Sequence, residues 1–218
     1  MIAKPVIAID GPGASGKGTL ARRLAAELGL PHLDTGLLYR AVGRLVLDAD
    51  GDPTDPSTAV SAARRLRAEH LGRADLRGPA ADAASSAVAA IPGVRDALLT
   101  FQRDFAARHG AVLDGRDIGT VIFPDAPVKL FVTATPQERA RRRWRELQGK
   151  GQTEMLAAVT RALEERDARD EARSAAPLRA ASDAIVLDTT ESDPDAVFAA
   201  ALAAVRSKLH QAGLDQTI

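Results

Sequence analysis

A glycine-rich segment near the N-terminus carries the residue types that bind phosphate. It reads Gly-Pro-Gly-Ala-Ser-Gly-Lys-Gly-Thr over residues 11–19, after an apolar run and before leucines at helical spacing. A strand, a glycine-rich loop and a helix in this order form a phosphate cradle, because loop N–H groups converge on the anion and the helix dipole adds positive charge. Lys17 can then reach the outer phosphates of a nucleoside triphosphate as a mobile charge. The candidate cradle residues are Gly11, Pro12, Gly13, Ala14, Ser15, Gly16, Lys17, Gly18 and Thr19.

The residue after Lys17 departs from the usual form of such a loop. A serine or threonine that binds Mg²⁺ normally stands there, whereas this chain has Gly18 and places its hydroxyl one position later, at Thr19. A magnesium ion would therefore depend on phosphates, waters and a carboxylate from elsewhere, and the sequence names no metal ligand. The alternative, a turn that happens to contain a lysine, leaves the flanking strand and helix unexplained.

Two more polar clusters directly follow apolar runs. Asp34 and Thr35, with Arg40 farther along, offer a carboxylate, a hydroxyl and a guanidinium that could hold a second substrate. Arg116 and Asp117 belong to an Asp-Gly-Arg-Asp string after residues 111–113. Each cluster has a plainer interpretation, an N-capped helix start for the first and a turn with a local Arg–Asp bridge for the second.

An arginine-rich segment follows residues 128–133. At 100° per residue, Arg139, Arg142 and Arg143 share one helix face, and Arg141 and Arg145 lie opposite. Only one of these faces can line a path for phosphates, and we take the first set as candidate catalytic residues. The alternative is a fully solvated surface helix.

A second charged helix carries Arg166, Asp170 and Arg173 at i, i+4 and i+7. The spacing predicts that Asp170 bridges both arginines. Taken alone, the pattern also fits an exposed ion-pair ladder. The four histidines fit no metal-ligand spacing, and we assign them no catalytic role.

Five short apolar segments alternate with helical patterns and must position these clusters. We expect strands at 5–10, 30–34, 111–114, 128–133 and 184–188. We expect helices from the glycine-rich loop to 28 and at 35–48, 57–69, 80–90, 94–109, 135–147, 154–174 and 194–209, with loops at 50–56, 70–79 and 115–120. Such alternation predicts a parallel sheet with helices on both faces and the polar clusters together at one edge.

Composition limits the class of protein. The 218 residues are enough for one α/β domain, and 45% hydrophobic residues with 3% aromatic residues predict an aliphatic core. The absence of cysteine excludes disulfides and thiolate metal sites. A net charge of zero argues against nucleic-acid binding, and no apolar run is long enough for a membrane span. The first residues lack a signal peptide, so we expect a cytoplasmic protein.

Together these motifs resemble bacterial cytidylate kinases over nearly the whole chain. The resemblance rests on residues 9–12 and 16–19, 34–36 with Tyr39 and Arg40, 92–95, 114–120, 123–129, 165–167 with Asp170 and Arg173, and 176–178. It implies a P-loop kinase fold with a five-stranded parallel sheet, a small monophosphate-binding excursion and a helical lid. The implied core is 1–34, 110–138 and 175–218, with the monophosphate-binding region at 35–109 and the lid with its flanking helix at 139–174. The family's longer β-stranded insert does not fit within residues 70–79.

The resemblance also implies a reaction, the transfer of a phosphoryl group from ATP to CMP or dCMP with Mg²⁺, by a monomer. Residues 11–19 would bind the ATP phosphates. Asp117 would read the cytosine amino group, assisted by Ser86 and Arg95. The residues implied around CMP are Asp34, Thr35, Arg40, Ser86, Arg95, Arg116, Asp117, Arg166, Asp170 and Arg173.

Two other functions stay open at this point. One is a different small-molecule kinase of the same fold, shikimate-like or gluconate-like, with an acceptor that is not a nucleotide. The other is a non-catalytic, nucleotide-dependent regulatory protein. The Asn-Lys-x-Asp string that reads guanine in such switches is absent from this sequence.

Overall fold

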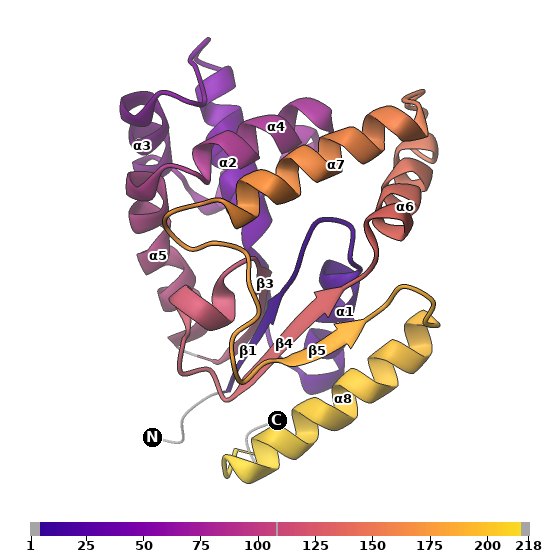
Figure 1. Ribbon diagram of the computed structural model, residues 1–218. Coiled ribbons are helices and arrows are strands. Elements are labelled where there is room, and N and C mark those ends of the chain that lie inside the picture. Colours follow the sequence, from indigo (N-terminus) through magenta and orange to yellow (C-terminus); the bar gives the residue numbers. More distant parts are fainter. Residues whose placement is uncertain (1–4, 108, 215–218) are drawn as a thin grey trace.

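The computed structural model describes residues 5–107 and 109–214. Its centre is a five-stranded parallel sheet in the order β2-β3-β1-β4-β5 (Figure 1). The strands are β1 (Val6–Asp10), β2 (His32–Asp34), β3 (Ala111–Gly115), β4 (Val128–Thr133) and β5 (Ile185–Asp188). The predicted parallel α/β sheet is confirmed, and β2 begins two residues later than expected.

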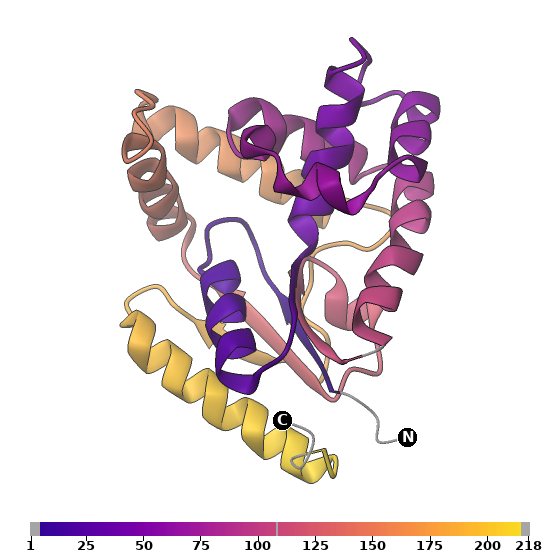
Figure 2. The same cartoon turned by 180° about the vertical axis from the view of Figure 1, so that it is seen from behind.

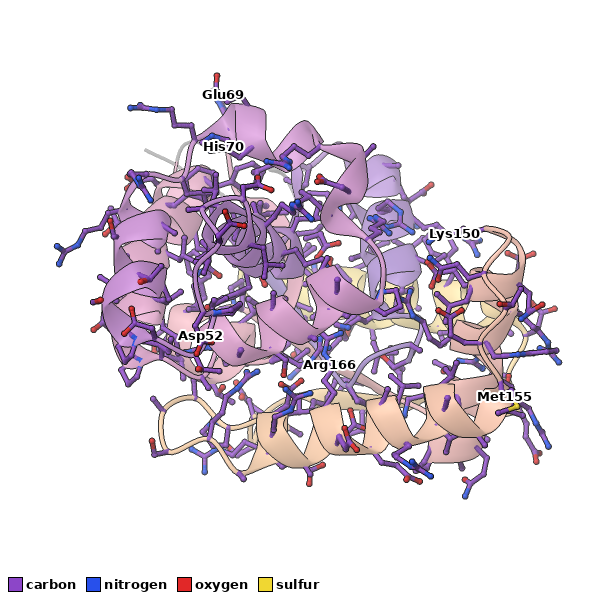
Figure 3. The ribbon with its side chains drawn as sticks, turned by 90° about the horizontal axis from the view of Figure 1, so that it is seen from above. Asp52, Glu69, His70, Lys150, Met155 and Arg166 are labelled. Atoms are coloured by element: carbon purple, nitrogen blue, oxygen red, sulfur yellow. The ribbon has the colours of Figure 1, made fainter. Side chains whose placement is uncertain are left out.

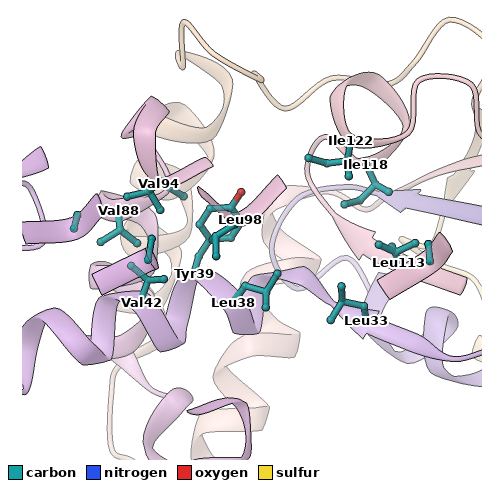
Figure 4. Packing of buried hydrophobic residues seen from close by; sticks show 14 of the residues in the cluster. Leu33, Leu38, Tyr39, Val42, Val88, Val94, Leu98, Leu113, Ile118 and Ile122 are labelled. Carbon is teal, nitrogen blue, oxygen red and sulfur yellow. The ribbon is translucent and has the colours of Figure 1, made fainter. Parts of the chain in front are cut away.

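Helices cover both faces of the sheet, and the alternation of side chains along β1 shows how. Ile7 and Ile9 pack with Leu24 of α1 (Lys17–Leu28) and Val205 of α8 (Pro194–Gln211). The helices α1 and α8 lie side by side in Figure 2. Ala8 faces the opposite cluster, which includes Leu33, Leu113 and side chains of α2 (Thr35–Leu47) and α5 (Pro92–Ala107) (Figure 4). Because successive strand residues point to opposite faces, the four apolar residues of β1 contribute to two cores.

A helical layer extends beyond the carboxyl ends of the strands. It contains α2, α3 (Pro56–Arg64), α4 (Pro79–Val88), α6 (Pro136–Gln148) and α7 (Leu156–Glu171), with α7 lying across the end of the molecule (Figure 1). Helices α2 and α4 approach closely at Gly43, where an added Cβ would lie 2.8 Å from the Cβ of Ala84. No helix among the described residues is long and apolar enough to cross a membrane.

Several element boundaries differ from those predicted. The helix expected at 57–69 ends at Arg64, and two 3₁₀ turns follow, η1 (Ala68–Gly72) and η2 (Ala74–Leu76), where a loop was expected. Leu76, only 1% exposed, anchors this segment to the core. The helix expected at 154–174 spans only 156–171, and the predicted helix end at 109 falls beside residue 108, which is outside the described residues.

The predicted loop 115–120 contains the start of a π-helical turn, η3 (Ile118–Ile122). The cause is the buried carboxylate of Asp10, whose two oxygens accept the N–H groups of Ile118 and Gly119, each at 2.8 Å. These bonds tie the end of β1 to the segment that follows β3. The end of the first strand thus fixes the path of the Asp-Gly-Arg-Asp segment.

Candidate active site

A cavity of ≈ 680 Å³ opens at the carboxyl ends of the strands. Its walls come from the glycine-rich loop, from α2 and α4, from the segment after β3, and from α6 and α7. Eleven basic and seven acidic side chains line it. This excess of positive charge suits a ligand that carries several negative charges.

The glycine-rich loop forms one wall through residues 13–19. Gly11 allows the loop to leave the sheet, because an added Cβ would lie 2.0 Å from the carbonyl oxygen of Val132. Gly16 has φ 90° and immediately precedes α1, whose first residue is Lys17. The loop therefore delivers a helix N-terminus and a lysine to the same wall, as a phosphate cradle requires.

Lys17 is held close to its own loop, where its Nζ donates to the carbonyl oxygen of Pro12 at 3.2 Å. Burial lowers the pKa of Lys17 to about 7, and the neighbouring charge of Arg116 lowers it further, against the carboxylates of Asp114 and Asp34. A bound phosphate would oppose this shift by favouring the charged amine.

Helix α6 turns the predicted arginine face inward, although its three members differ. Arg142 and Arg143 line the cavity, and the Nη1 of Arg142 also donates to Thr189 Oγ1 at 2.8 Å. Arg139 lies outside the cavity lining; it is 5% exposed and contacts the Gly13 carbonyl oxygen at 3.3 Å and Asp167 at 2.6 Å. Arg141 is 61% exposed.

Arg139 is held by buried partners away from the cavity. Its guanidinium supports the glycine-rich loop from behind and joins α6 to α7 through Asp167. A direct contact with a transferred phosphoryl group would require it to leave these buried partners. The geometry thus favours Arg139 as a positioning residue rather than a catalytic one.

The opposite wall holds the residues that the resemblance placed around a second nucleotide. All ten line the same cavity, namely Asp34, Thr35, Arg40, Ser86, Arg95, Arg116, Asp117, Arg166, Asp170 and Arg173. They come from the end of β2, from α2, α4, α5, the segment after β3 and α7, and from the residue just beyond the cap of α7. The sheet edge therefore brings together clusters that are far apart in the sequence, while the role of each residue stays a prediction.

Arg95 and Asp117 form a buried ion pair at the base of this wall. The Arg95 guanidinium also lies 5.6 Å from the centroid of the Tyr39 ring, which packs in the core beside Leu98 (Figure 4). Nearby, the buried Ser86 hydroxyl has no hydrogen-bond partner among the described residues. A buried hydroxyl without a partner is costly, so a ligand group is expected to fill this position.

The predicted bridge of Asp170 to both arginines of its helix is wrong for one of them. Asp170 pairs with Arg173 and, at 2.9 Å, with Arg116 from the segment after β3. Arg166 instead lies between α7 and α4 (Figure 3), 3.3 Å from Asp82. Asp170 is 1% exposed, which excludes the alternative of a solvated ladder.

Sequence reasoning missed Asp82, and it noted Asp114 only as part of the Asp-Gly-Arg-Asp string, without a place among the site residues. Asp82 on α4 contacts Arg40, Arg143 and Arg166; its signal was a lone charge in an alanine-rich helix, four residues before Ser86. Asp114 lies beside Asp34 in strand register, and its Oδ1 accepts from the His32 Nε2 at 2.8 Å. Its signal was the first aspartate of the Asp-Gly-Arg-Asp string, which follows a buried strand.

The sheet, the glycine-rich loop and the arginine helix above it define the class of P-loop kinases. The family model "Cytidylate kinase" matches residues 7–207. A cytidylate kinase of Granulibacter bethesdensis is 62% identical over 203 residues, covering 93% of this chain and 97% of that protein. One from Methylobacterium sp. is 62% identical over 204 residues with the same coverages.

The chain belongs to the cytidylate kinase family. The predicted family, the α/β P-loop kinase fold and the kinase class of enzyme are confirmed. Among solved structures, an uncharacterized protein from Eubacterium ventriosum shares the fold, with a TM-score of 0.56 and 15% identity over 94% of this chain and 99% of that one.

Proposed function

We propose that this chain transfers the γ-phosphoryl group of ATP to CMP or dCMP and releases ADP with CDP or dCDP. The observation that carries the proposal is the single cavity in which the glycine-rich loop faces the second cluster of cationic side chains. A donor on the loop and an acceptor on the opposite wall would meet between α6, α7 and the sheet edge.

Phosphoryl transfer needs alignment, charge neutralisation and exclusion of water more than it needs a protein nucleophile. In this proposal the loop N–H groups and Lys17 hold the donor phosphates. Arg142 and Arg143 reach the same space from α6 and stabilise the charge that spreads over the transferred group. A phosphate oxygen of the acceptor attacks, so no side chain must form a covalent bond.

The acceptor wall supports recognition of a cytosine base. Asp117 accepts from Arg95 through Oδ2, which leaves Oδ1 for the cytosine amino group. Ser86 carries a hydroxyl that is free of protein partners among the described residues. A carboxylate accepts from the amino group of cytosine but repels the carbonyl oxygen that uracil has there.

The family implies Mg²⁺, and there is space beside the glycine-rich loop where a neighbouring carboxylate could help to hold the ion. A Cβ at position 18 would lie 3.5 Å from Asp114 Oδ2, so the missing hydroxyl side chain leaves space beside this oxygen. Asp114, with Asp34 next to it in register, would hold the ion together with nucleotide phosphates, a typical arrangement for magnesium. The ion, when bound, would neutralise charge on the phosphate oxygens.

The test is a coupled ADP-release assay with CMP, dCMP, UMP, AMP and no acceptor. We expect turnover with CMP and dCMP well above the other arms. Turnover only with shikimate or gluconate would favour the other small-molecule kinases, and nucleotide binding without any product would favour a regulatory protein. The cytoplasmic location and the monomeric state stay predictions.

A further inference from the structure

Asp82 is the meeting point of three arginines from three different helices. Arg40 of α2 approaches Asp82 Oδ1 through Nε at 3.1 Å and Nη2 at 2.8 Å. Arg166 of α7 reaches the same oxygen at 3.3 Å, and Arg143 of α6 binds Oδ2. The side chains of these four residues are 15–19% exposed. Asp82 thus contacts three positive charges in a largely buried cluster, where Glu146 adds a second carboxylate, 2.8 Å from Arg143.

The cluster keeps an excess of positive charge even with Asp82 and Glu146 in place. Arg166 Nε is buried without a hydrogen-bond partner among the described residues. Burial lowers the pKa of Arg166 to about 10, and the charge of Arg116 lowers it further, although Asp82 acts in the other direction. These guanidiniums therefore attract a further anion, or a stronger one than a single carboxylate.

The carboxylate itself stands on a fixed support. Helix α4 packs so closely on α2 that no side chain larger than hydrogen fits at Gly43 opposite Ala84. Arg40 and Asp82 therefore belong to one rigid pair of helices, while Arg143 and Arg166 come from the separate α6–α7 pair. Asp82 thus forms ion pairs across these two parts, with Arg40 on one side and with Arg143 and Arg166 on the other.

We propose that Asp82 is an internal counter-anion that competes with a substrate phosphate for Arg40, Arg143 and Arg166, and so limits how tightly the site binds phosphate. A phosphate group carries more negative charge than a carboxylate and offers more acceptor oxygens. It can displace Asp82 from the guanidiniums, whereas weaker anions cannot. The inference rests on the proposed nucleotide site, and its readout is binding rather than turnover.

The test uses Asp82→Asn, which keeps the size of the side chain but removes its charge. Inorganic phosphate is titrated at constant ionic strength while the melting temperature is followed. Phosphate that binds the folded state raises this temperature with its concentration. We expect the midpoint of the phosphate effect to fall by about tenfold or more relative to the unsubstituted chain, because a repelling charge within a few ångströms has gone.

A matched control is Asp75→Asn, which removes an aspartate paired with arginines on the surface, 44% exposed and outside the cavity. Its phosphate midpoint should match that of the unsubstituted chain. The double variant Asp82→Asn with Arg143→Gln should lose most of the gain, which ties the effect to this cluster rather than to the glycine-rich loop.

Two sources of phosphate are separated by calorimetry with CMP and with a non-hydrolysable ATP analogue. Tighter binding of either ligand to Asp82→Asn supports the proposal and shows which phosphate competes. An unchanged phosphate midpoint with unchanged affinity for both ligands would overturn it. If Asp82→Asn folds only with phosphate present, that supports the proposal, and failure to fold at any phosphate concentration overturns it. An absence of CMP turnover in the unsubstituted chain would count against the proposed function. It would not affect the comparison of phosphate midpoints, which tests the role of Asp82.

Discussion

Lys17 is a half-buried side chain whose protein contacts do little to hold its positive charge. Its one hydrogen bond in the described residues goes to the Pro12 carbonyl oxygen, and burial followed by the charge of Arg116 lowers its pKa to about 7. A side chain in this setting contributes more to binding an anion than to the fold. Its position in the cavity wall could be predicted from sequence because loop, lysine and helix are contiguous.

Replacing Lys17 by alanine should therefore damage catalysis far more than folding. We expect kcat/KM to fall by about 10²-fold or more, in the range found when a major electrostatic donor is removed. Thermal unfolding checks that the fold is retained. A variant with nearly normal turnover would exclude the proposed phosphate cradle.

Asp117 tests the proposal for base recognition. Asp117→Asn offers an amide that can donate to the uracil oxygen as well as accept. Activity on CMP should therefore fall, and the ratio of kcat/KM for CMP to that for UMP should decrease roughly ten- to a hundredfold. The measurement is kcat/KM for both nucleotides in both proteins. An unchanged ratio, with both activities lowered together, would move base recognition to another residue.

At the scale of elements, helix α6 shows what periodicity can and cannot predict. The 100° rule placed Arg139, Arg142 and Arg143 on one face, and this face is the one directed inward. It could not show that Arg139 stops at the Gly13 carbonyl, because that contact depends on how α6 lies on the loop. The contact of Asp82 with three arginines could not be predicted for the same reason, because the arginines come from three different helices.

The two faces of α6 give a direct comparison. Replacing Arg142 and Arg143 by glutamine should lower kcat strongly, because both line the cavity, whereas replacing Arg141 and Arg145 should change it little. Arg139→Gln is measured separately and should lower stability as well as activity, since it leaves Asp167 without its partner. Equal, small losses of kcat from both faces would mean that α6 acts only as a surface helix.

At the scale of the whole molecule, features set by local sequence could be predicted, and features set by distant contacts could not. Alternating apolar runs predicted the five strands and their common edge, because each strand is specified by its own residues. The irregular segment after α3 was not predicted, because neither of its 3₁₀ turns follows a periodic pattern. Burial of Leu76 holds η2, and the Arg67 N–H donates to the His70 ring at 2.9 Å across η1. The tie from Asp10 to η3 joins residues more than a hundred positions apart and leaves no periodic signal.

Two groups at the sheet edge, the buried Asp10 and the half-buried Lys17, should give the protein an unusual dependence of stability on pH. Burial raises the pKa of Asp10 to about 7, so its folded form holds a proton that the unfolded chain releases near pH 4. Its contribution to stability is present at low pH and declines as the pH rises from about 4 to 7. Lys17 acts in the opposite sense. With a pKa of about 7 when folded and 10.5 when unfolded, it makes stability increase from about pH 7 to 10.

We therefore expect the free energy of unfolding of the nucleotide-free protein to pass through a minimum near neutral pH, with changes on the order of 1–3 kcal/mol on each side. Urea unfolding at a series of pH values measures it. Asp10→Asn should flatten the acidic limb, and Lys17→Met should flatten the alkaline limb, because each removes one proton-binding site. A saturating nucleotide that binds Lys17 should also remove the alkaline limb, since a phosphate restores the lysine charge in the folded state. If both limbs persist in both variants, the pH dependence of stability arises from other groups and not from Asp10 and Lys17.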